Sequence, residues 1–157
     1  MKFRKNAQYG FTLVELLIVI SIIGILTAVT VVNYGSAQQK ARDAQRKNDF
    51  KILRDQLEQY KLDQKTQSYP IANAATTISV ANYTTMQTLM TTGGYLKPPY
   101  PKDPKDKGAG IFMYRYQSDG STYTLDTCLE NKSDPSKQAT VSTQCTTANP
   151  NYQVTNP

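Results

Sequence analysis

The sequence predicts an α+β chain, in which one long N-terminal helix is followed by a small antiparallel β-sheet head. Three observations lead to this prediction. The stretch from Leu16 to Val32 carries no charge, apolar side chains then recur with helical spacing between residues 50 and 60, and two segments of strand-forming residues flank Asp119-Gly120. A long apolar run or a helical period favours a helix, whereas a short run bounded by turn residues favours a strand.

The composition narrows the classes of function. The chain has 157 residues, which is room for one domain and an appendage, and it contains no His, no Trp and two Cys. Catalysis by a His base, and zinc sites of four Cys or of paired Cys and His, cannot be built from this chain alone. The formal net charge of +6 weakly favours an anionic partner, but mixed charges at this density usually indicate a solvated helix face.

A basic leader and an apolar helix occupy the N-terminal part. Residues 1–10 hold three Lys or Arg and no acid, and the uncharged stretch follows a single acid, Glu15. About 20 apolar residues in a helix span a bilayer core of about 30 Å, so we expect a transmembrane helix over residues 11–34. The alternative is a secretory signal cut near Gly35-Ser36-Ala37, although the apolar region of such signals usually has only about 7–15 residues.

The orientation of this segment stays open on the residues alone. More Lys and Arg follow the apolar stretch closely than precede it, and by the positive-inside rule this favours a cytoplasmic C-terminus. The pair of Cys and the polar, Thr-rich distal region favour an extracytoplasmic one.

An amphipathic part continues the helix over residues 35–65. Apolar side chains recur there at intervals of 3, 4 and 3, at Phe50, Leu53, Leu57 and Tyr60. This spacing places them on one helical face. The predicted helix thus runs from Phe11 to about Gln64, and Pro70 with the polar residues after it ends the pattern.

Residues 66–157 are predicted to form the β head. Asp119-Gly120 between the segments 111–117 and 122–130 is typical of a two-residue hairpin turn, which would place Tyr116 opposite Tyr123. A short helix around residues 83–90 is also expected. The apolar face of the hairpin should cover the apolar face of the helix, giving a head core of Phe50, Leu53, Leu57, Tyr60, Phe112, Tyr114, Tyr116, Tyr123 and Leu125.

The head also offers two Cys and several acids in turns. Cys128 and Cys145 are most simply explained as a disulfide in an exported head with few apolar residues, and two free thiols in a reducing compartment are the alternative. Asp103, Asp106 and Asp119 would suit a calcium site, but acids in turns usually serve as turn formers. No metal ion or other cofactor is therefore predicted.

The boundary between leader and helix reads GFTLVE from Gly10 to Glu15. It closely resembles the class III signal of type IV pilins and type II secretion pseudopilins. Residues 40–70 are similar to the exposed half of the long helix in that family, and parts of residues 101–125 to its C-terminal sheet. The resemblance implies a type IV pilin-like fold and a prepilin peptidase that removes residues 1–10 by cutting between Gly10 and Phe11 and then methylates Phe11.

Glu15 stands out because an ionised carboxylate in hydrocarbon is expensive and is usually kept for a partner. The resemblance implies that Glu15 directs assembly, and we expect it to pair with the amine of Phe11. The alternative is an acid in the first helical turn, favoured by the helix dipole and hydrated at the interface.

These observations favour a structural subunit, not an enzyme, that polymerises through its N-terminal helix. The leading interpretation is a type IV pilus subunit with roles in adhesion, motility or DNA uptake. The second is the major pseudopilin of a type II secretion or competence pseudopilus. Alternatives of other classes are a single-pass membrane protein whose extracytoplasmic head binds a ligand without polymerising, and a membrane-anchored enzyme that uses carboxylates.

The expected locations and partners follow from this interpretation. The precursor is expected in the inner membrane, and the mature chain in an extracellular or periplasmic filament. Its partners would be further copies of itself in a helical homopolymer, the prepilin peptidase, the membrane, and the pilus or secretion assembly machinery. The lysines of the Lys97–Lys107 loop, with Lys132 and Lys137, suggest DNA as a further partner.

Overall fold

The structure, a computed structural model, describes residues 10–72, 78–108, 110–139 and 144–156, except for the side chains of residues 29 and 31–33. The predicted leader therefore lies outside the described residues apart from Gly10. The chain divides into two compact units, residues 1–37 and residues 38–157.

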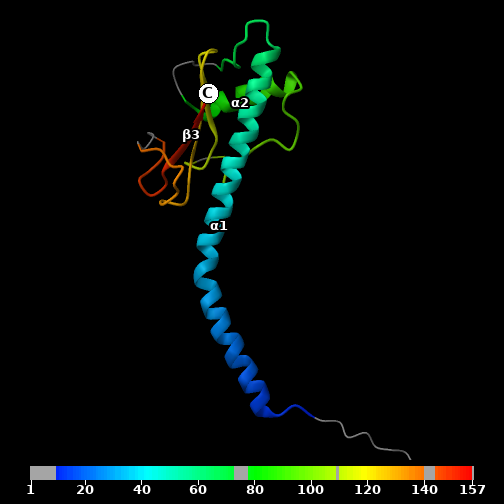
Figure 1. Ribbon diagram of the computed structural model, residues 1–157, viewed down its shortest axis with the longest axis vertical. Helices are drawn as coiled ribbons and strands as arrows, with labels where there is room; N and C mark the ends of the chain where they lie inside the picture. The colour runs from blue at the N-terminus through cyan, green and yellow to red at the C-terminus, as the bar shows by residue number, and fades with distance from the viewer. Residues whose placement is uncertain (1–9, 73–77, 109, 140–143, 157) are drawn as a thin grey trace, which may run out of the picture. The chain divides into compact units, whose positions relative to one another are not determined.

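One long helix contributes to both units. Helix α1 extends from Leu13 to Asp63 (Figure 1). The sequence predicted a start at Phe11, but Phe11 and Thr12 precede the helix. The reason is that the hydroxyl of Thr12 accepts a hydrogen bond from the backbone N–H of Glu15 at 3.2 Å, as the side chain of an N-cap residue does.

The core of the second unit lies between one face of α1 and the sheet. Phe50, Leu53 and Leu57 are fully buried, and the ring of Phe50 meets the ring of Tyr114 edge-on, with centroids 5.1 Å apart. Tyr60 packs against this core but is only partly buried. The buried cluster consists of Phe50, Leu53, Leu57, Tyr69, Ala72, Tyr83, Met86, Met90, Leu96, Tyr114, Tyr116, Tyr123 and Leu125.

Phe112, which the sequence analysis placed in this core, lies outside the buried cluster. Strand β1 (Arg115–Ser118) begins later than predicted, so Phe112 precedes the sheet and is only half-buried. Its ring faces two cations: the guanidinium carbon of Arg46 is 5.0 Å and the ammonium of Lys105 4.3 Å from the ring centroid. Cation–π contacts of this kind contribute about 0.5–2 kcal/mol each.

The sheet has three antiparallel strands in the order β1-β2-β3, with β2 at Tyr123–Cys128 and β3 at Asn151–Thr155. The predicted pairing of β1 with β2 is present, but its register is different. Tyr116 lies opposite Leu125, not opposite Tyr123. The displacement is two residues, which keeps the same side chains on the apolar face because side chains alternate with a period of two.

The cause of this displacement is a wider turn between β1 and β2. The carboxylate of Asp119 accepts hydrogen bonds from Ser121 N at 2.8 Å and Thr122 N at 2.7 Å, so the acid organises a four-residue loop in place of a two-residue turn. These bonds lower the pKa of Asp119. Gly120 has a φ of +92°, which glycine adopts without strain.

Two elements flank the predicted hairpin. Helix α2 (Val80–Thr92) is longer than the predicted helix over residues 83–90, because Ser79 caps it by accepting a hydrogen bond from Asn82 N at 3.1 Å. Strand β3 was not predicted. Its Tyr152 and Val154 pack against the core from alternate positions, but this pattern is only five residues long.

Cys128 and Cys145 form a disulfide in the structure, with Cα atoms 5.6 Å apart. The buried side chain of Arg115 lies against it, with Nη2 at 3.3 Å from the sulfur of Cys128 and 3.2 Å from that of Cys145. Arg115 also pairs with Asp126. Burial raises the pKa of Asp126 despite this pairing.

Within the described residues, no helix provides a stretch long and apolar enough to cross a membrane. The span predicted over residues 11–34 includes residues 29 and 31–33, whose side chains lie outside the described part.

Leu53 and Ile52 test the packing of α1 against the head. Leu53 is fully buried and its neighbour Ile52 is 41% exposed. Leu53→Ala should lower the free energy of unfolding by about 2–5 kcal/mol because it leaves a cavity, whereas Ile52→Ala should cost less than about 1 kcal/mol. Urea unfolding of the full chain in mild detergent, followed by tyrosine fluorescence, measures both. Equal losses for the two variants would contradict the burial of this face.

Candidate functional site

A capping box sets the start of α1 at the predicted cleavage signal. The backbone N–H and the hydroxyl of Thr12 both donate to Oε2 of Glu15, at 2.9 and 2.7 Å, while Glu15 N donates to the Thr12 hydroxyl. This reciprocal arrangement satisfies donors that the helix itself cannot. The Thr12-x-x-Glu15 spacing is its sequence signature, which the sequence analysis did not use. Glu15 is therefore an N-terminal helical acid with a defined orientation.

The peptide bond predicted to be cut lies just outside the helix. Gly10 and Phe11 are exposed and non-helical, and among the described residues no atom beyond the chain neighbours of Gly10 lies within 4 Å of the position where its Cβ would stand. Exposed, non-helical backbone is where proteolysis concentrates. The structure thus leaves the Gly10–Phe11 bond accessible to a peptidase.

The first half of α1 exposes an unusual number of apolar side chains. Exposed fractions in the helix range from 46% at Val19 to 82% at Leu13, and Phe11, just before the helix, is 85% exposed. The hydroxyls of this part are used within the helix: Ser21 donates to Leu17 O at 2.7 Å, and the threonines at 27 and 30 donate to the carbonyls four residues earlier. Large exposed apolar surfaces mark contacts with proteins or membranes, and satisfied hydroxyls lower the cost of covering them.

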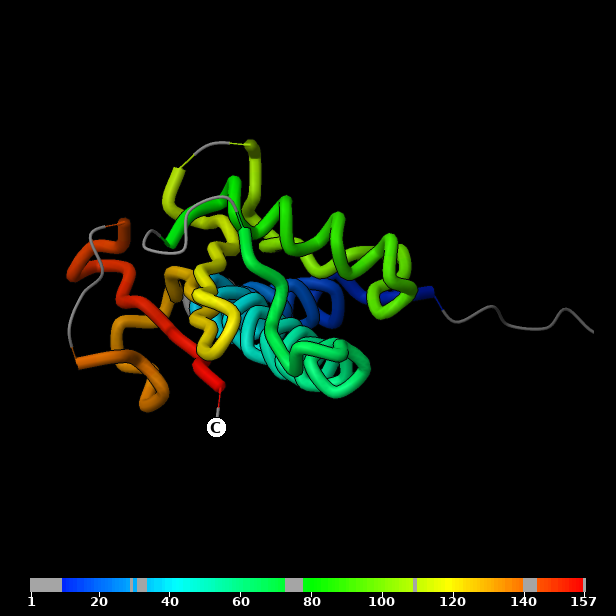
Figure 2. Tube along the Cα trace, turned by 90° about the horizontal axis from the view of Figure 1, so that it is seen from above, coloured from blue at the N-terminus to red at the C-terminus, as the bar shows by residue number. Residues whose placement is uncertain are grey.

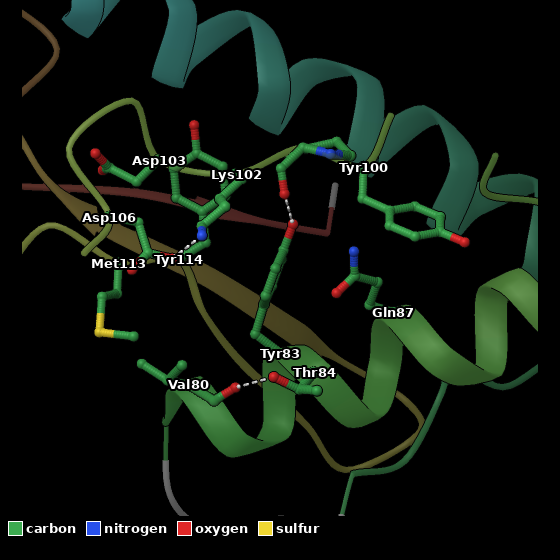
Figure 3. A pocket seen from close by; sticks show the side chains of 11 residues that line it. Val80, Tyr83, Thr84, Gln87, Tyr100, Lys102, Asp103, Asp106, Met113 and Tyr114 are labelled. Atoms are coloured by element: carbon green, nitrogen blue, oxygen red, sulfur yellow. Dashed lines mark hydrogen bonds and ion pairs between the residues drawn. The ribbon is translucent and has the colours of Figure 1, made fainter. Parts of the chain in front are cut away.

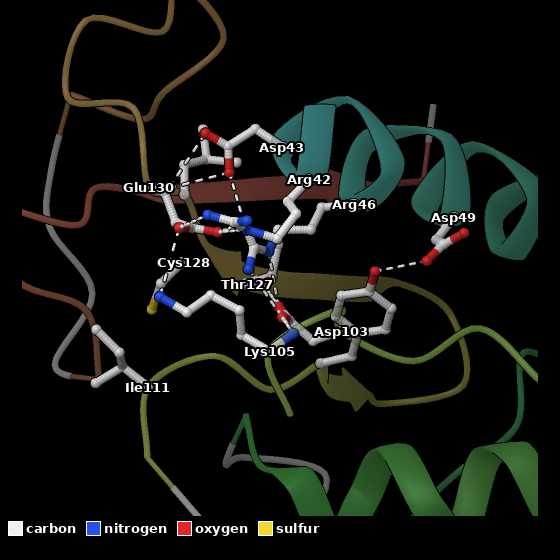
Figure 4. A network of polar contacts seen from close by, with 12 residues as sticks. Arg42, Asp43, Arg46, Asp49, Asp103, Lys105, Ile111, Thr127, Cys128 and Glu130 are labelled. Atoms are coloured by element: carbon white, nitrogen blue, oxygen red, sulfur yellow. Dashed lines mark hydrogen bonds and ion pairs between the residues drawn. The ribbon is translucent and has the colours of Figure 1, made fainter. Parts of the chain in front are cut away.

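The second half of α1 is fastened to the head by a buried cation. Arg46 is fully buried, and its guanidinium forms a two-point contact with the carboxylate of Asp103, at 2.8 Å for each hydrogen bond. The remaining nitrogen donates to Asp43 at 2.7 Å and to Glu130 at 2.9 Å. The helix, the loop before β1 and the segment after β2 therefore meet at one side chain (Figure 4).

Further charges complete this cluster. Arg42 makes a two-point contact with Glu130, both bonds at 2.7 Å, and the ammonium of Lys105 is 3.4 Å from the same carboxylate. Asp43 accepts the backbone N–H groups of Glu130 and of the next residue, at 2.8–3.2 Å. We call this group the ion cluster; its members are Arg42, Asp43, Arg46, Asp103, Lys105 and Glu130. Its three cations and three anions give it a formal net charge of zero.

The charge states in the ion cluster follow from its geometry. Burial acts to lower the pKa of Arg46, but the hydrogen bonds and charge of Asp103 outweigh burial and raise it, so the guanidinium stays charged. Burial likewise acts to raise the pKa of Glu130, but hydrogen bonds from Arg42 and Arg46 dominate and lower it to about 2. The expectation of a solvated helix face was wrong for Asp43 and Arg46, which are buried.

The loop closed by the disulfide provides a second fastening point. Lys47 donates to both oxygens of Asp134, at 2.7 and 2.6 Å, and lies 3.3 Å from the hydroxyl of Ser136. Glu130 pairs with two cations of α1 and Asp134 with a third, so three ion pairs with α1 come from residues shortly after Cys128. The disulfide holds the chain at the base of these contacts.

A hollow of about 340 Å³ lies between α2 and the loop before β1 (Figure 3). Two tyrosines in its wall use their hydroxyls inside the protein: Tyr83 donates to Pro101 O at 2.7 Å, and Tyr114 to Asp49 at 2.6 Å. Burial raises the pKa of both tyrosines. These hydroxyls are therefore neutral, and each is already used in a hydrogen bond within the protein.

The suggested calcium ligands do not come together. Asp103 binds Arg46, Asp106 accepts the N–H of Gly108 at 2.6 Å, and Asp119 organises the turn after β1. The described residues contain no group of three or more His, Cys, Asp or Glu suited to a metal ion.

The lysines suggested to contact DNA are partly neutralised within the protein. Lys105 belongs to the ion cluster, and Lys102 lies 3.7 Å from Asp106. Lys97, Lys107 and Lys132 are exposed.

Comparison with known proteins agrees with the fold and the N-terminal signal, which together define a pilin-like protein. A family model described as the prokaryotic N-terminal methylation motif matches residues 5–31, and one described as type II secretion system (T2SS), protein G matches residues 33–142. The chain therefore belongs to the protein G family of type II secretion systems.

Relatives of this family carry the name type II secretion system core protein G. The one from Vibrio cholerae serotype O1 is 34% identical over 126 residues, which cover 80% of this chain and 80% of the relative. Those from Aeromonas hydrophila and Escherichia coli K12 are 40% and 38% identical, over 38% and 43% of this chain and 42% and 46% of their own lengths. No solved structure matches. The relatives favour the pseudopilin interpretation over the pilus interpretation.

Arg46 and Arg54 form a matched pair to test the ion cluster. Arg46→Met should lower the free energy of unfolding by about 3–5 kcal/mol, because it leaves buried acids without their partner. Arg54 lies on the same helix, with 44% of its side chain exposed and a 3.3 Å contact to Asp55, so Arg54→Met should cost less than about 1 kcal/mol. Urea unfolding of the full chain measures both, and a loss at Arg46 as small as at Arg54 would refute the fastening role.

Glu130 should give the head a characteristic acid sensitivity. Its folded pKa of about 2 lies below the ordinary value of 4.5, so its contribution to stability is present above about pH 4.5 and is lost as the pH falls toward 2. The unfolding free energy of the wild-type chain should fall across this window, and Glu130→Gln should reduce the slope. Asp55→Asn, at a side chain that is 61% exposed, is the control. An unchanged slope in Glu130→Gln would contradict the assignment.

Proposed function

We propose that this chain is a non-catalytic subunit of a type II secretion pseudopilus, made as a membrane-anchored precursor and assembled into a periplasmic filament. The observation that carries the proposal is the N-terminal part of the described chain: an accessible Gly10–Phe11 bond, a capped start of α1, and a series of exposed apolar side chains. Such a surface must be covered by lipid or by protein. Membership of the protein G family supports covering by further copies and by secretion machinery.

Processing would prepare the chain for polymerisation. We propose that a prepilin peptidase cuts after Gly10 and that Phe11 becomes the methylated N-terminus. The capping box would persist, because it involves only Thr12 and Glu15. The new amine would then lie one residue before the N-cap, close in the chain to the carboxylate of Glu15.

Glu15 would select the register of assembly. One of its oxygens, Oε2, accepts the two hydrogen bonds from Thr12, and the other remains available for the amine of Phe11 on a neighbouring copy. An unpaired ion excluded from water costs several kcal/mol. A subunit with its helix out of register would leave both charges unpaired, so the pair would reject it.

The proposal is tested by what is assembled and how it is processed. Filaments sheared from cells or purified from the periplasm should contain this chain, and intact-mass analysis should show a chain of 147 residues that begins at a methylated Phe11. Material that retains residues 1–10, or a new terminus near Ala37, would overturn the processing step. Full membrane retention without any filament would favour a non-polymerising membrane protein.

Glu15→Gln and Glu15→Ala separate the two roles of this side chain. Glu15→Gln keeps an acceptor for the capping box and Glu15→Ala removes it, so only the second should weaken the helix start, by about 1 kcal/mol. Both should reduce entry into filaments about tenfold or more in a mixture with wild-type chains, since both remove the charge. Quantifying each variant in purified filaments is the measurement. Incorporation of Glu15→Gln at the wild-type level would leave capping as the sole role.

A further inference from the structure

Helix α2 presents an outward face without any charge. The helix reads VANYTTMQTLMTT, and its exposed side chains are Ala81, Thr84, Thr88, Leu89 and Thr92, whereas Thr85 is half-buried. We call the five exposed residues the threonine face. On a chain with 18 cationic and 12 acidic residues, an uncharged helix at the surface is conspicuous, because surface helices normally carry charges on their outer side.

The hydroxyls of this helix are already bonded. Each of its five threonines donates to the carbonyl oxygen four residues earlier, at 2.7–3.2 Å, including Thr88 to Thr84 O at 3.0 Å. A bonded hydroxyl loses little when water is removed, and its oxygen can still accept a hydrogen bond. Covering the threonine face therefore costs little and leaves a row of acceptors for a partner with N–H groups.

Strand β3 has the complementary properties. It pairs with β2 on one side, and no other strand among the described residues pairs with its outer side. An open edge offers N–H and C=O groups, and proteins usually protect such edges with Lys, another charge, Pro or a bulge. The sequence of β3, NYQVT, contains none of these residues. At one end Gln138 N donates to Asn151 O at 2.9 Å, and Thr155 at the other end is exposed.

The two surfaces lie at opposite edges of the sheet. Ser79, the cap of α2, bridges to Tyr116 of β1 through hydrogen bonds of 3.2 and 3.1 Å, so α2 covers the β1 edge, and β3 is the other edge. Figure 2 shows α2 in green and β3 in red on opposite sides of the sheet. Two different patches on opposite sides of a subunit join copies head to tail, in an open filament unless the rotation closes a ring, whereas one self-complementary patch closes a dimer.

We propose that the threonine face of one subunit covers the open edge of β3 of the next subunit. This contact rests on the proposed filament function and names the head surfaces used in it. A second copy is the occupant because each surface lacks charge, one supplies acceptors and the other N–H donors, and their placement suits repetition. A hollow of about 210 Å³ bordered by Thr88, Thr91 and Tyr100 gives room beside the face for a side chain of the edge strand.

Charge substitutions in the full chain test the contact. Thr88→Lys and Thr155→Glu each place one charge on one of the two surfaces, and each should reduce incorporation into filaments about tenfold in a mixture with wild-type chains. Thr88→Gln and Thr155→Gln are the uncharged controls of similar size and should reduce it less than about threefold. Both positions are exposed, and circular dichroism should show the fold of each of the four variants unchanged.

Combined variants give the decisive comparison. In the chain with both Thr88→Lys and Thr155→Glu, the lysine of one copy meets the glutamate of the next, so incorporation should recover at least severalfold over either single variant. Thr88→Lys with Thr155→Lys should not recover. Wild-type incorporation of both single variants, or a double variant no better than the worse single one, overturns the proposed contact. Absence of filaments from the unaltered chain instead refutes the proposed function.

Discussion

The burial of one guanidinium governs how the head is attached. Arg46 is withdrawn from water, and a buried cation is tolerated only when acids surround it with good geometry. Asp103 comes from the loop before β1 and Glu130 from the segment after β2. Each segment is thus held at a fixed place on α1. The loop closed by Cys128 and Cys145 contains Glu130, so its first residues are held there too. Such a cluster specifies one arrangement of these segments more than it adds stability.

The two halves of α1 have the same secondary structure but different surroundings. The second half packs Phe50, Leu53 and Leu57 into a core and compensates its buried charges within the same chain. The first half exposes its apolar side chains and bonds its hydroxyls to its own backbone. One half is complete by itself, and the other needs surroundings that a single copy does not provide. This division is what a subunit that polymerises requires.

The sequence predicted those features that depend on local pattern. The 3-4-3 spacing predicted the buried face of α1, and GFTLVE predicted the family. It failed where distant residues decide the outcome: Arg46 is paired with Asp103 and Glu130, 57 and 84 residues away in the chain, and no local pattern signals such a partner. The predicted hairpin register was wrong because Asp119 accepts hydrogen bonds from two backbone N–H groups and so widens the turn. Strand β3 was not predicted because its five residues, next to Pro150, are too few to show a clear alternation of apolar and polar side chains.

The position of the capping box just beyond Gly10 has a consequence for how processing acts. The bonds that begin α1 join only Thr12 and Glu15, so the same helix start exists before and after a cut at Gly10. What the cut changes is charge: the leader carries three cations and no acid, and its loss takes the formal charge from +6 to +3. Under the proposed processing, loss of the leader would therefore change the charge next to the helix and leave the helix start as it is.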